Sequence, residues 1–216
     1  MTYRACVQHR WAGFCAVVIC LAGLQSAKTD VLSWTAVTGD WFEVNNWTNL
    51  TSAIDTRVPA DGDDVVISIA GAYVSLTNSP AQMGSLAISN ASLVFSNWDT
   101  LLSATNVTVL NKGVLTCGGP FTNDAVSNRV NLLCSNLLVE AGGAINVLGK
   151  GFSGGINITN TYNNGHGPGG GLILDERGGG GHGGAGAHRR KFWWRTNSVY
   201  GSATAPLEPG SGGGAG

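Results

Sequence analysis

Short apolar runs alternate with polar turns through most of the chain. From residue 28 onward, runs of Val, Ile, Leu and Thr are separated by Asn, Gly, Ala and Ser. Apolar runs of strand length, bounded by turn-forming residues, are typical of β-strands. No window after residue 28 shows the 3.6-residue period of a long amphipathic helix. The pattern therefore predicts an all-β protein with many tight turns.

Three of these runs resemble one another and indicate a repeated strand–turn–strand unit. The copies are Leu86–Phe95, Val107–Thr116 and Leu137–Asn146, and Val66–Leu76 is a weaker copy. The turns of the first two copies, at Asn90 and Asn111, are 21 residues apart, and the next turn, at Ala141, follows after 30. The longer interval predicts an inserted loop around residues 118–128.

A strand-turn-strand repeat of about 20 residues predicts a solenoid, because one unit cannot bury its apolar face alone and must stack on its neighbours. We expect a right-handed parallel β-helix in which Leu86–Phe95 and Val107–Thr116 lie side by side with parallel strands. Asn90 and Asn111 would then occupy equivalent turn positions and form a side-chain ladder. The alternative is a β-sandwich of antiparallel hairpins whose similarity is accidental.

A tryptophan-rich segment precedes the repeats. Its distinctive residues are Trp34, Gly39, Trp41, Asn46, Trp47, Pro59, Gly62, Asp63 and the run Val65–Ile67. Over residues 34–69 this pattern resembles the opening module of bacterial exported β-helix proteins, including autotransporter-like passengers and adhesins. The resemblance implies a cap that covers the open end of the first coil, which would otherwise expose unpaired strand edges.

From residue 149 the composition changes to a glycine-rich segment. It contains the blocks Gly-Gly-Gly-His-Gly-Gly at 179–184, Tyr-Gly-Ser at 200–202 and Pro-Gly-Ser-Gly-Gly-Gly at 209–214. This order resembles the glycine-rich module inside very large microbial surface proteins, and we expect the module to be truncated at Gly216. Composition alone would also fit a flexible linker, but Phe152, Tyr162 and Tyr200 supply apolar mass that a linker does not need.

The N-terminus has the pattern of a secretory signal peptide. Arg4 and Arg10 precede the 14-residue uncharged run Trp11–Leu24, which ends in small residues near Ala27. The run is shorter than the roughly 20 residues that span a bilayer, which disfavours the alternative of an uncleaved membrane anchor. Removing it leaves ten Lys and Arg against 13 Asp and Glu, a net charge of about −3. That charge gives no general attraction for nucleic acid.

These observations divide the chain into four parts. They are a signal peptide at 1–27, a tryptophan-rich cap with the first strand at 28–69, β-helix coils at 70–148 and the glycine-rich module at 149–216. The expected location is secreted or on the cell surface, and the membrane is contacted only through the export signal.

One stretch, residues 188–195, concentrates basic and aromatic side chains. The candidate glycan-binding residues in it are Arg189, Arg190, Trp193, Trp194 and Arg195. Tryptophan can stack on flat ligand faces and arginine can bind acidic groups. The alternative interpretation is a loop whose tryptophans pack inward.

Cysteine and acidic residues offer little further chemistry. Cys117 and Cys134 either form a disulfide, as an exported protein allows, or act as small buried apolar residues. Asp61, Asp63 and Asp64 suit calcium binding or turn capping equally well. The histidines have no metal-ligand spacing, so we expect no metal and no cofactor.

No catalytic residues can be assigned from the sequence. It has no nucleophile elbow, and Asp99, Lys112, Asp124, Arg129 and Lys150 are candidates for polysaccharide cleavage only by default. We therefore expect a structural or adhesive surface protein without catalytic activity, whose partners are extracellular glycans or other cell-surface proteins. The alternative is a carbohydrate-binding or polysaccharide-degrading protein. A smooth coil face covered by Asn and Thr would favour the adhesive protein, and an acidic cleft lined by Lys and Arg would favour the enzyme.

Overall fold

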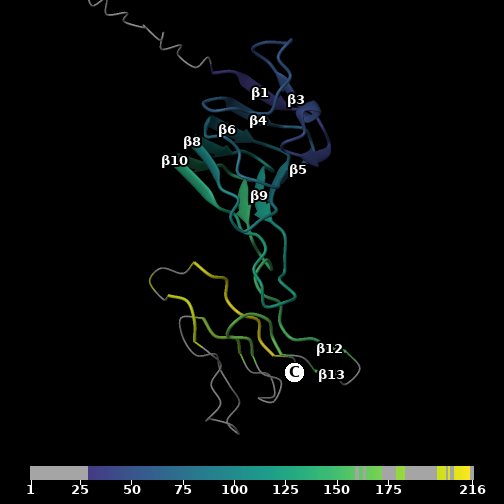
Figure 1. Ribbon diagram of the computed structural model, residues 1–216, viewed down its shortest axis with the longest axis vertical. Helices are drawn as coiled ribbons and strands as arrows, with labels where there is room; N and C mark the ends of the chain where they lie inside the picture. The colour runs from purple at the N-terminus through teal and green to yellow at the C-terminus, as the bar shows by residue number, and fades with distance from the viewer. Residues whose placement is uncertain are drawn as a thin grey trace, which may run out of the picture.

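In the computed structural model most strands belong to two sheets (Figure 1). The structure describes residues 29–158, 161–162, 164–171, 179–182, 199–202, 204 and 207–214. The first sheet contains β1 (Val31–Trp34), β3 (Trp47–Asn49), β4 (Asp64–Ile67), β6 (Met83–Ile88), β8 (Leu102–Val109) and β10 (Leu132–Val139). The second contains β2 (Thr38–Asp40), β5 (Tyr73–Leu76), β7 (Ser92–Phe95), β9 (Val114–Cys117) and β11 (Ala144–Asn146). A 3-10 turn, η1 (Val44–Asn46), and the pair β12 (Asn157–Ile158) and β13 (Thr161–Tyr162) complete the elements.

From β4 onward the chain alternates between the two sheets, so that each repeat gives one strand to each sheet. The strand order is β10-β8-β6-β4-β1-β3 in the first sheet and β11-β9-β7-β5-β2 in the second. β6 pairs in parallel with β8, and β7 pairs in parallel with β9. The expected side-by-side placement of Leu86–Phe95 and Val107–Thr116 is therefore confirmed, and these copies are not antiparallel hairpins.

The predicted fold class, a right-handed parallel β-helix solenoid, is wrong. The structure is all-β, as expected, but it is a pair of sheets of which the first is mixed. β3 pairs antiparallel with β1 at the edge of that sheet, and β12 and β13 form a separate antiparallel pair. The repeat period predicted that strands would stack, but it does not determine the number of sheets or the direction of strands outside the repeats.

The core lies between the two sheets and explains why these short runs form strands. Inward-facing residues of neighbouring strands stand in register and are at most 1% exposed. In the first sheet they include Val65, Leu86 and Val107, and in the second sheet Val74, Leu93 and Leu115. Removing this apolar surface from water is the main driving force for the fold.

The turns that lead into the second sheet share one left-handed residue. Gly71, Asn90, Lys112 and Gly142 have φ angles of 74°, 53°, 57° and 85°. The register of β5, β7, β9 and β11 places all four at the same position, two residues before the strand. Asparagine and glycine adopt this conformation readily, whereas lysine does so at a cost.

The expected side-chain ladder between Asn90 and Asn111 is wrong. The turn between β8 and β9 has one residue more than the turn between β6 and β7, so Asn90 is level with Lys112. An amide ladder is present elsewhere: Asn136 on β10 donates from Nδ2 to Oδ1 of Asn106 on β8 over 2.8 Å. The sequence similarity placed the turns correctly but not their alignment.

The described parts of the glycine-rich segment pack backbone against backbone, below the sheets in Figure 1. The amide of Gly212 donates to the carbonyl of His166 over 2.9 Å, and that of Gly171 donates to the carbonyl of Gly212 over 2.9 Å. A Cβ on Gly212 would lie 1.9 Å from the Ser153 carbonyl oxygen, so glycine is required there. These contacts differ from those of a flexible linker.

Candidate functional site

The structure places few of the site residues that the sequence suggested. Arg189, Arg190, Trp193, Trp194 and Arg195 all lie outside the described residues. Cys117, at the end of β9, is buried in the core, and Cys134, on β10, packs against that core. Both are free thiols on strands of different sheets, and the disulfide is not formed in the structure.

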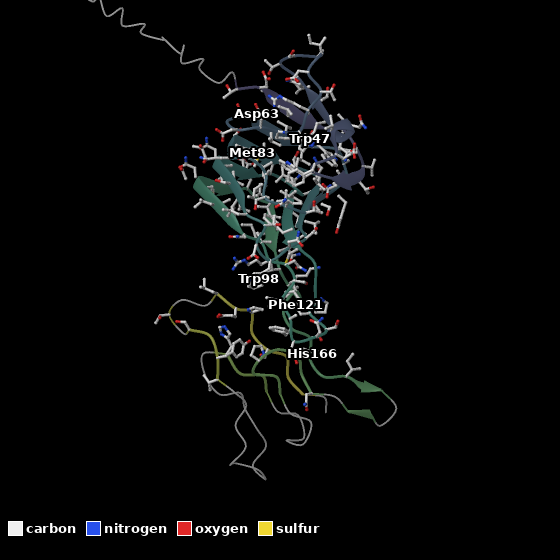
Figure 2. The ribbon with its side chains drawn as sticks, viewed as in Figure 1. Trp47, Asp63, Met83, Trp98, Phe121 and His166 are labelled. Atoms are coloured by element: carbon white, nitrogen blue, oxygen red, sulfur yellow. The ribbon has the colours of Figure 1, made fainter. Side chains whose placement is uncertain are left out.

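A pocket of about 490 Å³ lies where the sheets meet the glycine-rich segment. Figure 2 shows Trp98 and Phe121 at this narrow connection, with His166 beyond it. The inserted loop between β9 and β10 supplies Phe121 and the run 128–131. The lining residues are Trp98, Cys117, Phe121, Asn128, Arg129, Val130, Asn131, Val147, Lys150, Gly151, Leu207, Glu208 and Pro209. The pocket therefore joins parts of the chain that are more than 100 residues apart.

A line of aromatic rings packed edge to face holds the inserted loop in place. Phe121 packs edge-on against Phe152 with centroids 5.3 Å apart and against Trp98 at 6.5 Å. The backbones of Phe121 and Phe152 also form a parallel β-bridge. Phe121 and Phe152 are buried while Trp98 is half-buried, so the indole is the ring that remains accessible.

Arg129 is fixed by two contacts to Trp98. Its Cζ lies 4.6 Å from the Trp98 ring centroid, and its Nε donates to the Trp98 carbonyl over 2.9 Å. A guanidinium over an indole ring is a favourable cation–π arrangement. Within the described part of the chain its two terminal nitrogens make no hydrogen bond, so they remain available as donors at the pocket wall.

Asn128 places an unsatisfied acceptor in the same wall. The residue is 9% exposed, and its Nδ2 donates to the Ser127 hydroxyl over 2.9 Å. Its Oδ1 is buried and has no donor among the described residues. Buried polar atoms are nearly always hydrogen-bonded, so this oxygen indicates a position where a donor from outside the chain fits.

Among the described residues, the ionisable groups at the pocket are two cations, one carboxylate and a thiol. Lys150 is half-buried and Glu208 is exposed, and they form no ion pair with each other. Burial raises the pKa of the Cys117 thiol, and the charge of Lys150 offsets only part of that effect. The thiol is therefore protonated at neutral pH and unsuited to nucleophilic attack.

Sequence reasoning found part of this site and missed the rest. Arg129 and Lys150, candidates only by default, are brought together at the pocket, whereas Lys112 lies in a turn and Asp124 lies 3.8 Å from His166. Trp98 was not singled out, because a lone tryptophan between strands carries no pattern. The predicted insertion around residues 118–128 was the one feature that could have indicated the pocket.

Away from the pocket, an ionic cluster around Arg57 holds the N-terminal segment in place. Arg57 binds Asp30 at 3.0 Å and Asp55 at 2.9 Å, and it also pairs with Asp63. The Asp63 carboxylate, 1% exposed, further accepts the Ala60 amide at 2.7 Å and the Asp30 amide at 3.2 Å. The hydrogen bond to Asp63 is the main cause that raises the pKa of Arg57.

Burial by itself raises the pKa of Asp63. The hydrogen bonds from Arg57, Ala60 and Asp30, together with the charge of Arg57, outweigh burial and lower the pKa below its usual value. Asp64 accepts from the Ser85 hydroxyl over 2.6 Å. Asp63 and Asp64 are thus engaged by the protein itself, and no group of three potential metal ligands converges in the part of the chain that the structure describes.

Residues 46–133 match the family model of the G8 domain. The match spans β3 to the start of β10 and includes the inserted loop, but it covers less than half of the 216 residues. Searches of curated proteins and of solved structures found no match. G8 domains are typically extracellular, which supports the expected location at that level. No helix among the described residues is long and apolar enough to cross a bilayer.

Proposed function

We propose that the protein is an exported structural or adhesive component of a bacterial cell surface with no catalytic activity of its own. Residues 1–27 direct its export, and the mature chain is secreted or held at the surface. The resemblance of residues 34–69 and 149–216 to bacterial surface proteins supports this proposal. The typically extracellular occurrence of G8 domains is consistent with it.

The observation that carries the proposal is the near absence of charge on the strands. Among the described strands, Asp40 and Asp64 are the only charged residues. Some solvent-facing positions carry small polar side chains instead, as in the register column of Ser85, Asn106 and Asn136, and others on β10 carry uncharged apolar side chains. Catalysis on such a face would need titratable groups opposite one another, so this surface suits contact rather than chemistry.

A carbohydrate-binding role is the second candidate, and the pocket at Trp98 favours it. An accessible indole, an unsatisfied amide oxygen and two cations that pair with no described residue suit recognition of a polar ligand. Polysaccharide cleavage is less well supported, because Glu208 is the only carboxylate among the described residues that line the pocket. Hydrolysis by the usual mechanism needs a pair of carboxyl groups.

An adhesion assay tests the main proposal. Beads coated with the purified full chain should attach to immobilised polysaccharides or to cells more strongly than beads coated with albumin. The same polysaccharides, incubated with the chain, should release no new reducing ends and no unsaturated products. Attachment equal to that of albumin would overturn the adhesive role, and release of products would overturn the non-catalytic one.

Export is tested separately in a bacterial host. The full chain should appear outside the cytoplasm with its first residues removed, and a chain that lacks residues 2–27 should stay in the cytoplasm. Mass spectrometry of the exported protein gives the new N-terminus. Equal cytoplasmic retention of both chains would contradict the assignment of a signal peptide.

A further inference from the structure

We propose that the pocket at Trp98 binds one unit of an acidic polysaccharide, that is, a sugar ring bearing a carboxylate. The inference rests on the proposed adhesive function and names its ligand class. The residues that would recognise the sugar are Trp98, Asn128, Arg129 and Lys150, all of which line the pocket. None of them lies in the basic stretch 188–195.

The dimensions of the pocket suit a small ligand. Its volume of about 490 Å³ falls within the range of roughly 300–1,000 Å³ that is typical of small-molecule sites. Trp98, Phe121, Val130, Val147 and Pro209 give it apolar walls. A pyranose ring presents an apolar face of C–H groups, and this face can lie against such a wall.

The amide oxygen of Asn128 suits a ligand that donates hydrogen bonds. Asn128 Oδ1 has no donor within the described residues, and its Nδ2 is already directed to Ser127. Because buried acceptors are normally satisfied, a ligand group that carries a donor would complete this site. A sugar hydroxyl supplies such a donor, whereas a simple inorganic anion such as sulfate does not.

The charges at the pocket favour an anion. Arg129 and Lys150 form no ion pair in the described part of the chain, and the facing ionisable groups are Glu208 and the protonated thiol of Cys117. The planar guanidinium of Arg129 is held by Trp98 with its terminal nitrogens unused. This arrangement fits a carboxylate, which guanidinium binds with two parallel hydrogen bonds.

An acidic sugar combines the three features in one ring: a hydroxyl donor, a carboxylate and an apolar face. An acidic peptide offers carboxylates but no such ring face, and a neutral sugar leaves both cations unpaired. The geometry therefore points to a uronic-acid unit of a polysaccharide rather than to either alternative.

Calorimetric titration of the full chain tests this assignment with three probes: a trigalacturonate, the neutral galactose trisaccharide and a glutamate-rich peptide. We expect saturable binding of the trigalacturonate alone, weakening as salt is added because the contact is ionic. Lys150→Gln should weaken binding about tenfold, since it removes a charge-assisted hydrogen bond. Lys112→Gln makes the same change in a turn away from the pocket and should leave binding unchanged.

A second variant, Asn128→Asp, replaces the amide with an acceptor that carries a negative charge and should abolish binding. Circular dichroism shows whether each variant is folded, and Lys150→Gln, at a half-buried surface position, keeps the test valid if Asn128→Asp unfolds. Equal binding of the neutral sugar or the peptide would overturn the assignment. So would an equal effect of Lys112→Gln and Lys150→Gln, or no binding of trigalacturonate at millimolar concentration.

The outcomes separate this inference from the proposed function. If beads coated with Lys150→Gln attach as well as wild type, adhesion stands and the pocket is not its site. If trigalacturonate binds in solution but coated beads never attach, the pocket assignment stands and the adhesive role fails.

Discussion

At the scale of single residues, the residue at the left-handed turn position determines how much backbone strain each repeat carries. Gly71 and Asn90 suit this backbone, but Lys112 adopts the same conformation with φ 57°. A side chain with a Cβ in this region costs about 1–2 kcal/mol per residue, less for asparagine. The four positions are equivalent in register but are not equally favourable.

Lys112→Gly should therefore raise the free energy of unfolding by about 0.5–1 kcal/mol, because glycine removes the strain at this φ and loses some of the gain through its flexible unfolded state. Urea denaturation followed by circular dichroism measures the change. Gly142→Ala is the opposite control: its Cβ would lie 2.4 Å from Asn111 Oδ1, so it should lower stability. A destabilised Lys112→Gly variant would contradict this account.

The Arg57 cluster makes the free energy of unfolding depend on pH in the acidic range. The pKa of Asp63 is lowered in the folded protein, so its contribution is fully present above the unfolded pKa of about 3.9. It is lost progressively as pH falls below that value through the folded pKa. The urea concentration at the midpoint of unfolding, measured from pH 7 to pH 2, should therefore decrease as the pH falls below about 4.

The matched variant for this prediction is Asp63→Asn. It should be less stable than wild type at pH 7, because Arg57 loses its buried partner, and its stability should fall less on acidification. If the stability of both proteins fell equally on acidification, Asp63 would not be the cause of the pH dependence.

At the scale of elements, the tryptophan-rich segment is the best example of what the sequence could predict. Three tryptophans within 14 residues are too many for a linker, and the structure packs Trp34 and Trp41 against Trp47 with centroids 5.1 and 4.8 Å away. The cap itself was implied only by the resemblance to exported proteins. The hydrophobic pattern also predicted the strands. It could not predict the antiparallel pairing of β3 with β1, because pairing direction depends on how the intervening segment turns.

Trp47→Ala should lower the free energy of unfolding by about 3–5 kcal/mol, since it removes a large buried ring from the centre of this cluster. Trp47→Phe keeps a ring but loses the hydrogen bond from Nε1 to the Trp41 carbonyl, 2.6 Å long, and should cost less. Thermal unfolding of the three proteins gives the order. Equal losses in both variants would show that ring packing is not the main contribution.

At the scale of the whole molecule, the sheets end in an exposed apolar edge. β10 is the last strand of the first sheet and contains no charged residue. Leu133, Leu137 and Leu138 on it are 60%, 47% and 53% exposed. An uncharged edge strand with unpaired backbone groups invites pairing with another chain.

Leu138→Lys should therefore reduce self-association, because a charged side chain on an edge strand opposes strand pairing. Light scattering over a range of protein concentrations measures the effect. Leu50→Lys is the matched control, since Leu50 is also exposed, at 64%, but lies beyond β3. If Leu50→Lys reduced association as much as Leu138→Lys, the edge would not be its cause.

The pocket shows where prediction from sequence stops. Trp98, Asn128, Lys150 and Glu208 meet only because the units stack and the glycine-rich segment folds back beneath them. Nothing in their spacing along the chain indicates this meeting. The basic stretch at 188–195 was a candidate site because its residues are adjacent in the sequence. Residues that meet only in the folded structure give no such pattern.

The inserted loop between β9 and β10 leaves the sheets undisturbed. β8 and β10 stay paired over Leu102–Val109 although their sequence offset is 30 residues, against 21 between β6 and β8. Extra length in a surface loop costs little, since the closure entropy grows only with the logarithm of loop length. Grafting a different loop at this point would change the shape of the cavity and leave the stability of the sheets largely intact. This junction is therefore the natural place to engineer a new specificity.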